Sequence, residues 1–225
     1  MELDAHPQGQ SPGPTAVWTW RELLVLAFTL SYLAPFTLVC LRGGNREFFL
    51  YLGVMVVLIA VVGGLHARVR LHLVSLWGLS LWGLAHLSGG LVPIPASWPH
   101  EDTLVLYDWW LIPERLKYDQ VLHAYGFGLT TWVCWQGLAR ALAHHGAPVS
   151  PSWGLLTLCF AAGMGFGALN EVIEFLATLL IPNTNVGGYV NTGWDLVFNA
   201  CGSLAAALGI AVFSQRRRLQ QRAEP

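Results

Sequence analysis

Two glutamates lie in the otherwise apolar stretch from Trp153 to Ile181, and their chemistry calls for a partner. Glu171 and Glu174 are three residues apart, so a helix places both on one face, where each raises the cost of ionising the other. An acidic side chain at the centre of a bilayer costs roughly 2.5–3.5 kcal/mol, so the pair must face protein, water or a cation rather than lipid. A shared proton or a bound cation would relieve the repulsion between the two carboxylates.

The composition is typical of a multi-pass membrane protein. Of the 225 residues, 54% are hydrophobic and 11% are charged, and several apolar runs exceed about 18 residues. Only helices satisfy every backbone group in lipid without closing a barrel, and these runs are too long for barrel strands. We therefore expect an all-α fold, a membrane helix bundle with about six transmembrane helices. The expected spans are about Val17 to Leu41, Phe48 to Leu65, Leu71 to Val92, Asp119 to Ala143, Trp153 to Ile181 and Thr192 to Phe213.

The distribution of Lys and Arg predicts the orientation. Residues 1–15 are expected to form a disordered cytoplasmic leader, residues 16–214 the six-helix transmembrane domain, and residues 215–225 a basic cytoplasmic tail. Eight cations on the side of the termini against four on the other side favour cytoplasmic termini. The eight are Arg21, Arg68, Arg70, Arg140, Arg216, Arg217, Arg218 and Arg222, and the four are Arg42, Arg46, Arg115 and Lys117. The arginine run near the C-terminus suits anionic lipid, and a nucleic-acid partner is not expected.

The segment from Pro93 to Lys117 is the longest expected connection on the outer side. It mixes acidic residues with aromatic ones, which are Trp98, Tyr107, Trp109 and Trp110. Such a segment suits the level of the lipid headgroups. It is either an interfacial belt or a lid over a site embedded in the membrane.

Connectivity brings the polar residues of the spans to one side of the membrane. The third span ends there, the fourth begins, the fifth ends and the sixth begins. At about 1.5 Å per residue, the polar residues lie roughly 5–15 Å below those ends. They are His86, His123, Glu171, Glu174, Asp195 and Asn199. Asp119 and His123 are also four residues apart, as are Asp195 and Asn199, so each pair shares a helical face.

This set of side chains suggests a catalytic or metal-binding site. Glu171, Glu174, His123 and Asp195 are the candidate catalytic residues, and the same four could bind a divalent metal ion. Imidazole with carboxylates would suit zinc, manganese or iron, and a metal ion would activate water. However, the sequence lacks the HExxH motif and the ExxH pairs of di-iron bundles.

The candidate substrate-binding residues are His86, Asp119 and Asn199. Each also has a structural interpretation. His86 and Asn199 could form hydrogen bonds between helices. Asp119 could cap its helix or fix the tautomer of His123, and Asp195 could interact with a helix dipole.

Four sequence blocks resemble the YjdF-like family of bacterial inner-membrane proteins. They are His86-Leu-Ser-Gly-Gly90, Tyr118-Asp-Gln-Val-Leu-His123, Glu171-Val-Ile-Glu174-Phe175, and Thr192-Gly-Trp-Asp195 with Gly202. The last three blocks are also similar to a broader VanZ-like pattern, in which an Asp and a His open one span, a Glu-rich span follows, and Asp and Asn precede a Gly. The resemblance runs from the second expected span to the end of the chain. It implies a multi-pass protein of the bacterial inner membrane whose biochemical activity is unestablished.

The leading hypothesis from the sequence is an intramembrane enzyme acting on a lipid or lipid-linked envelope substrate at the outer leaflet. A proton- or cation-coupled transporter would use the glutamate pair as its proton site. A non-catalytic membrane scaffold would use the polar cluster only to hold helices together. The sequence names neither a substrate nor an oligomeric state.

Overall fold

The computed structural model describes residues 18–43, 46–147, 149–182, 184 and 186–223. The expected leader at residues 1–15 lies outside the described residues. Within these residues there are six α-helices, namely α1 (Trp20–Gly43), α2 (Arg46–Val69), α3 (Leu73–Leu91), α4 (Tyr118–His144), α5 (Trp153–Leu180) and α6 (Tyr189–Ala223). The all-α expectation is thus confirmed.

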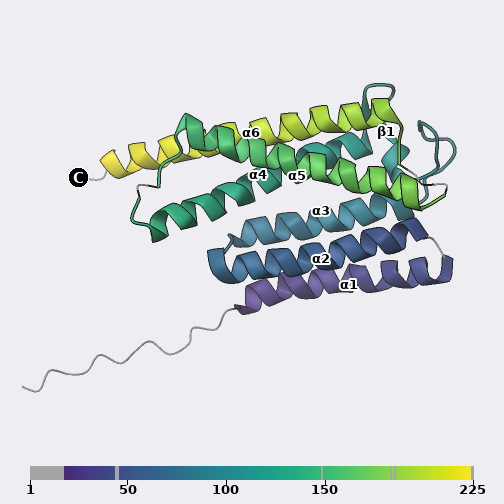
Figure 1. Cartoon of the computed structure of the whole chain (residues 1–225), viewed down its shortest axis with the longest axis horizontal. Helices are drawn as coiled ribbons and strands as arrows, with labels where there is room; N and C mark the ends of the chain where they lie inside the picture. Colours follow the sequence, from purple (N-terminus) through teal and green to yellow (C-terminus); the bar gives the residue numbers. More distant parts are fainter. Residues whose placement is uncertain (1–17, 44–45, 148, 183, 185, 224–225) are drawn as a thin grey trace, which may run out of the picture.

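The helices run alternately up and down the long axis of the bundle (Figure 1). α1 to α3 lie together in one half, and α4 to α6 form the other half. The beginning of α1 and the end of α6 lie at the same end of the molecule, as an even number of crossings requires. Which of the two ends faces the cytoplasm stays a prediction.

Four helices are long and apolar enough to cross a membrane, namely α1, α2, α5 and α6. Two of the six expected spans, α3 and α4, fall outside this set. α4 carries Asp119, Gln120, His123 and Gln136, which lower its apolar content. Because both helices lie alongside the four apolar ones (Figure 1), we still expect them to cross the bilayer.

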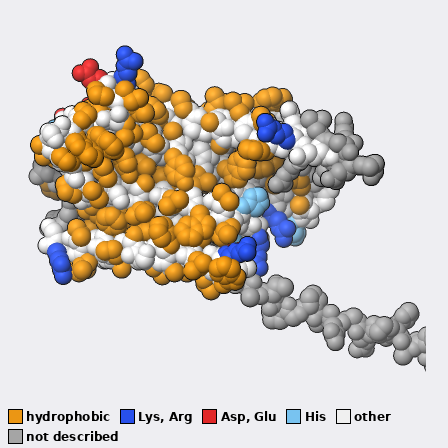
Figure 2. Space-filling view, turned by 180° about the vertical axis from the view of Figure 1, so that it is seen from behind, with side chains coloured by type: hydrophobic (Ala, Val, Ile, Leu, Met, Phe, Trp, Pro, Cys, Tyr) orange, Lys and Arg blue, Asp and Glu red, His pale blue; other side chains and the backbone are white. Residues whose placement is uncertain are grey.

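The surface agrees with a lipid environment. Hydrophobic side chains cover the middle of the face in Figure 2, and most charged ones visible there lie toward the ends. Large apolar residues on the outside include Val56, Val61, Phe175, Leu179 and Leu204. In water such a continuous apolar surface would drive association, so it fits contact with acyl chains.

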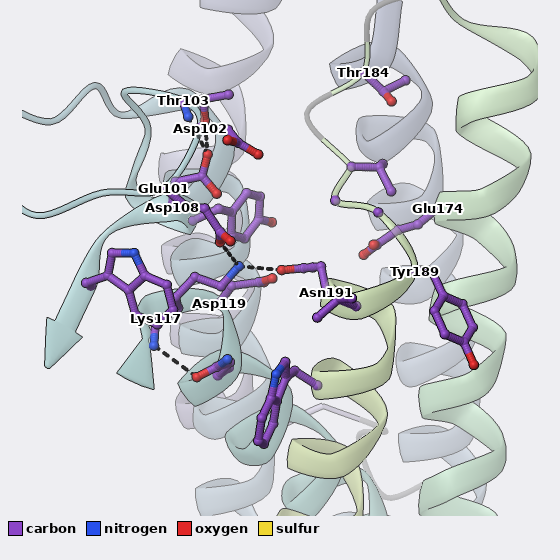
Figure 3. Close-up of a pocket in the computed structure, with 18 of the residues that line it drawn as sticks. Glu101, Asp102, Thr103, Asp108, Lys117, Asp119, Glu174, Thr184, Tyr189 and Asn191 are labelled. Atoms are coloured by element: carbon purple, nitrogen blue, oxygen red, sulfur yellow. Dashed lines mark hydrogen bonds and ion pairs between the residues drawn. The ribbon is translucent and has the colours of Figure 1, made fainter. Parts of the chain in front are cut away.

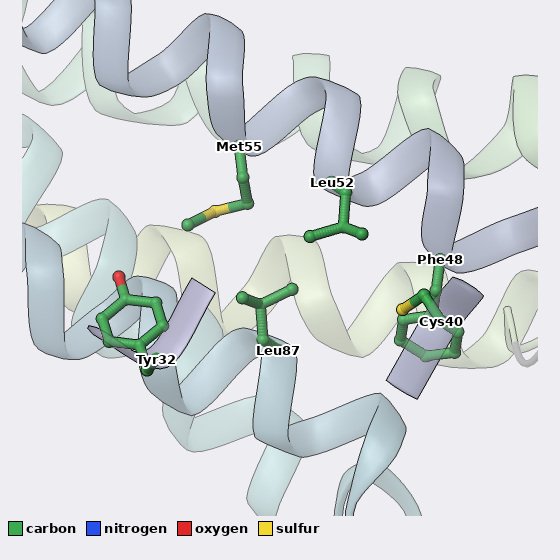
Figure 4. Close-up of a cluster of buried hydrophobic side chains, with 6 residues drawn as sticks. All are labelled: Tyr32, Cys40, Phe48, Leu52, Met55 and Leu87. Atoms are coloured by element: carbon green, nitrogen blue, oxygen red, sulfur yellow. The ribbon is translucent and has the colours of Figure 1, made fainter. Parts of the chain in front are cut away.

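A core cluster joins the first three helices. Tyr32 and Cys40 of α1, Phe48, Leu52 and Met55 of α2, and Leu87 of α3 are buried together (Figure 4). Two α3 glycines make room for these side chains, because a Cβ at Gly83 would lie 2.7 Å from the Met55 methyl carbon and one at Gly90 would meet the Phe48 ring.

Glycines also set the spacing of the second half. A Cβ at Gly128 of α4 would lie 2.9 Å from the Gly202 carbonyl oxygen of α6, and a Cβ at Gly202 would overlap the Ala124 carbonyl group. On α5, a Cβ at Gly167 would lie 2.6 Å from Asn199 Nδ2. Small residues at such positions let membrane helices approach closely. The approach brings polar side chains of α4, α5 and α6 within reach of one another.

The outer connection between α3 and α4 is folded. It contains the 3₁₀ helix η1 (Leu106–Asp108) and the antiparallel strands β1 (Trp110–Ile112) and β2 (Leu116–Lys117). Isolated bridges pair Pro93 with Val105 and His100 with Trp109. Tyr107 fixes this segment to α3, because its ring lies against Gly89 and Gly90 and its hydroxyl donates to the His86 carbonyl oxygen at 2.7 Å.

Candidate functional site

His123 is the centre of the polar cluster. It lies on α4, its side chain is only 5% exposed, and polar groups of three helices surround its ring. The Nδ1 atom is 3.0 Å from Asn199 Oδ1 and 3.7 Å from Glu171 Oε1. The Nε2 atom is 3.6 Å from Asp119 Oδ1 and 3.9 Å from Asp195 Oδ1. The structure therefore brings together side chains that the sequence placed at similar depth.

Glu174 lies beside this group. One oxygen atom each from Glu171 and Glu174 and one ring nitrogen of His123 lie within 4.8 Å of one another. Glu174 Oε1 accepts a hydrogen bond of 2.7 Å from Asn170 Nδ2, one helical turn earlier. The two glutamates thus share one face of α5 that is turned toward His123.

Several buried polar atoms at the centre have no hydrogen-bond partner among the described residues. They are both carboxylate oxygens of Glu171, Asp195 Oδ1 and Asn199 Nδ2. Asp195 and Asn199 are 1% and 0% exposed, so solvent does not compensate them. A buried carboxylate oxygen without a partner costs free energy. The cluster is therefore incomplete as a purely structural hydrogen-bond network.

His86 lies next to the cluster rather than in it. Its ring is in contact with Tyr51, Trp82 and Tyr107, whose ring centroids lie 5.6–6.3 Å away. His86 and His123 line a small shared pocket. Burial raises the pKa of Tyr107 in the outer segment, so its hydroxyl stays protonated and can donate to the His86 carbonyl group. His86 is thus placed to meet a bound molecule but not to share a metal ion with the carboxylates.

A cavity of about 480 Å³ opens above the cluster at the outer end of the bundle. Asp119, Glu174 and His86 line it, together with residues of the outer segment and of the start of α6 (Figure 3). Its carboxylates are Glu47, Glu101, Asp102, Asp108, Glu114, Asp119 and Glu174, against the cations Arg115 and Lys117. This excess of negative charge attracts cations to the cavity.

Lys117 and Asn191 connect the outer segment to the cluster. Lys117 Nζ donates to Glu101 Oε2 at 2.6 Å and to Asn191 Oδ1. Asn191 Nδ2 in turn donates to Asp195 Oδ2 at 2.6 Å. Figure 3 shows the side chains of Lys117 and Asn191, which both line the cavity, pointing toward each other. The chain of contacts runs from the outer segment to a carboxylate of the site.

The sequence prediction missed these connecting residues. Asn191 lies one helical turn before Asp195, but the sixth span was expected to begin at Thr192, whereas α6 begins at Tyr189. Lys117 was counted only as a charge outside the membrane, yet it is 5% exposed. Glu47 precedes the second expected span, which begins at Phe48, and was given no role, yet it lies in α2 and lines the cavity. The four-residue spacing from Asn191 to Asp195 was the signal that could have revealed the first contact.

A second histidine contact, between His66 and Glu22, lies apart from the polar cluster. His66 is completely buried, and its Nε2 atom lies 3.1 Å from Glu22 Oε1. Its ring also contacts Trp18. This pair lies at the end of the bundle that is opposite to the cavity, so it takes no part in the site (Figure 1).

Comparisons with known proteins agree with the membrane fold. No curated protein and no solved structure matches the chain. One family model matches residues 17–216, which include all seven candidate site residues and most of the described chain. The chain belongs to this family, which is described as predicted membrane protein (DUF2238).

Proposed function

We propose that the protein is an intramembrane enzyme that acts on a lipid or a lipid-linked envelope substrate. The observation that carries the proposal is the set of buried carboxylate oxygens of Glu171 and Asp195 that surround a single imidazole and have no hydrogen-bond partner among the described residues. Replacing buried charged groups by apolar residues is often neutral or stabilising, so helix packing alone does not account for such a cluster. Buried acidic and imidazole groups that converge next to a cavity are typical of active sites.

Each group has a role in this proposal. Glu171 or Glu174 is the general base, and both lie on the side of α5 that faces His123. His123 and Asp195 complete the catalytic set, with a divalent metal ion as the candidate cofactor. His86, at the cavity wall, orients the substrate or supplies a proton.

Asp119 and Asn199 are the remaining substrate-binding candidates, and their positions differ. Asp119 lines the cavity, so a substrate can reach it directly. Asn199 is completely buried behind His123, and its contact with Nδ1 gives it a positioning role instead.

The location of the cavity agrees with action at the outer leaflet. It lies at the end of the bundle opposite to the described chain ends, and the Lys and Arg count favours cytoplasmic termini. Together with the YjdF-like blocks and the VanZ-like pattern of the C-terminal half, this supports placement in the inner membrane of a bacterium. The outer segment then covers the site, as the lid interpretation requires, because Glu101, Asp102 and Tyr107 line the cavity.

A proton- or cation-coupled transporter is the second candidate. In its favour, buried polar residues continue beyond the cluster toward the opposite end, namely Thr131, Gln136 and Ser203. These groups are neutral, and Thr131 and Ser203 both donate to the Phe127 carbonyl oxygen. Neutral groups that already form hydrogen bonds with the backbone offer no binding site for a proton or cation that crosses the membrane. The enzyme is therefore the preferred proposal.

The test compares the lipids of cells that produce the wild type or a variant with both Glu171→Gln and Glu174→Gln. Membrane lipids and lipid-linked precursors are measured by mass spectrometry in cells with equal amounts of the protein in the membrane. A matched control, Leu179→Ala, changes an exposed apolar residue of the same helix. We expect the wild type and the control to alter the lipid profile and the double variant to leave it unaltered. An identical profile with the double variant would refute the enzyme, and substrate-dependent proton uptake into proteoliposomes would support the transporter.

A further inference from the structure

We infer that a divalent metal ion binds on the Nε2 side of His123, where Asp119, His123 and Asp195 are its ligands, and that Glu171 and Glu174 do not coordinate it. The inference rests on the proposed function for the use of the ion in catalysis. It departs from the metal set expected from the sequence, because Asp119 enters the set and both glutamates leave it.

The hydrogen bond to Asn199 selects the nitrogen that binds the metal. Asn199 Oδ1 is an acceptor only, and it lies 3.0 Å from His123 Nδ1. The proton of the neutral imidazole is therefore on Nδ1, and the lone pair is on Nε2. Metal-binding histidines commonly donate their other N–H group in this way, which fixes the tautomer and the ring orientation.

The distances on the Nε2 side suit a shared ion. Nε2 lies 3.6 Å from Asp119 Oδ1 and 3.9 Å from Asp195 Oδ1, and the three ligand atoms all lie within 4.8 Å of one another. Two ligands that are each about 2.1 Å from a tetrahedral ion lie about 3.4 Å apart. Small rotations of the side chains would shorten the 3.6 and 3.9 Å separations to about 3.4 Å. On the other side of the ring, the proton on Nδ1 excludes an ion between His123 and Glu171.

Asp195 is held like a metal ligand. Its Oδ2 atom accepts a 2.6 Å hydrogen bond from Asn191, whereas its Oδ1 atom is buried without a hydrogen-bond partner among the described residues. Asn191 is itself held by Lys117. One oxygen is thus fixed and the other is turned toward Nε2, as expected when outer groups orient a ligating carboxylate.

The position of Asp119 explains how a substrate could reach the ion. Asp119 and His123 are one turn apart on α4, and Asp119 also lines the cavity. Three protein ligands leave coordination positions for water and substrate, the arrangement found in catalytic rather than structural sites. One imidazole with two carboxylates suits the series from manganese to zinc.

This assignment frees the two glutamates for proton transfer. Glu174 lines the cavity, so it can accept a proton from a metal-bound water molecule. Glu171 lies deeper, on the Nδ1 side of the imidazole. Loss of either carboxylate should therefore affect turnover and leave metal binding nearly unchanged.

The experiment measures metal binding by the full chain in lipid nanodiscs. The protein is stripped with a chelator, titrated separately with Zn²⁺ and with Mn²⁺, and analysed for bound metal per chain. We expect one ion of at least one of these metals in the wild type, loss of that ion in Asp119→Asn and Asp195→Asn, and retention within about threefold in affinity in Glu171→Gln and Glu174→Gln. Glu22→Gln is the matched control, because it removes a carboxylate that lies beside His66 at the opposite end of the bundle and does not line the cavity; it should bind as the wild type does.

Two results would overturn the inference. One is an unmetallated wild type in both titrations. The other is loss of the ion in the glutamate variants with retention in the aspartate variants. If the aspartate variants do not fold, Asn199→Ala supplies the test, since loss of a supporting hydrogen bond should weaken binding about 10–100-fold. The lipid-profile comparison tests the enzyme separately, so an active protein without metal would refute this inference alone.

Discussion

Replacing Gly202 by alanine tests whether the approach of α4 and α6 holds the site together. A Cβ at Gly202 would overlap the carbonyl group of Ala124, the residue after His123. Backbone cannot rotate away as a side chain can, so the helices must separate by on the order of 1 Å. Overpacking of this kind costs about 1–3 kcal/mol in the free energy of unfolding.

The same separation should disrupt metal binding. His123 Nε2 and Asp195 Oδ1 lie on these two helices and are 3.9 Å apart. Two ligands at about 2.1 Å from one ion are at most about 4.2 Å apart, so a further opening of about 1 Å places them beyond a shared ion. Gly202→Ala should thus lose bound metal although every ligand is retained.

The assay combines thermal unfolding in detergent with analysis of metal per chain. Gly209→Ala on the same helix is the matched control, because nothing lies within 4 Å of a Cβ at that position. Alanine is favoured over glycine within helices by about 1 kcal/mol, so the control should unfold at the same or a higher temperature. If Gly202→Ala equals the control in stability and metal content, close packing of α4 on α6 does not position the site.

Three further predictions follow from the contacts around the site. Asn191→Ala removes the hydrogen bond to Asp195 and should weaken metal affinity about 10–100-fold, as measured by titration in nanodiscs. Chelation of the wild type should lower its unfolding temperature, and addition of Zn²⁺ or Mn²⁺ should restore it, whereas Asp195→Asn should not respond. Gly89→Ala should displace the Tyr107 ring and release the outer segment, as measured by faster proteolysis within residues 93–117, while metal content stays at the wild-type value.

Convergence of the polar groups was predictable because it depends on connectivity and helical period. Asp119 and His123 share a face of α4, Asp195 and Asn199 share a face of α6, and antiparallel helices with short connections place their ends at the same level. The hydrophobic pattern fixed the number of helices for the same reason. No side-chain detail was needed for either conclusion.

Rotation about each helix axis could not be predicted, and it decides what each polar group touches. His86 lies at a depth similar to that of His123, but its face of α3 turns toward Tyr51, Trp82 and Tyr107. The nitrogen of His123 that is available to a metal depends on the hydrogen bond with Asn199, and these two residues are 76 positions apart in the sequence. Such contacts follow from close packing at glycines, which a single sequence does not reveal.

The two halves of the bundle contribute different residues to the candidate site. α4, α5 and α6 supply the carboxylates and the amide around His123, whereas α2 and α3 contribute Glu47, Tyr51 and His86 to the cavity wall. The ligands inferred for a metal ion between α4 and α6 all belong to the second half, so the first half can vary in the cavity that it lines without removing a ligand. In the proposed enzyme, α4, α5 and α6 would therefore carry the chemistry, and the cavity that α2, α3 and the outer segment build over them would select the substrate.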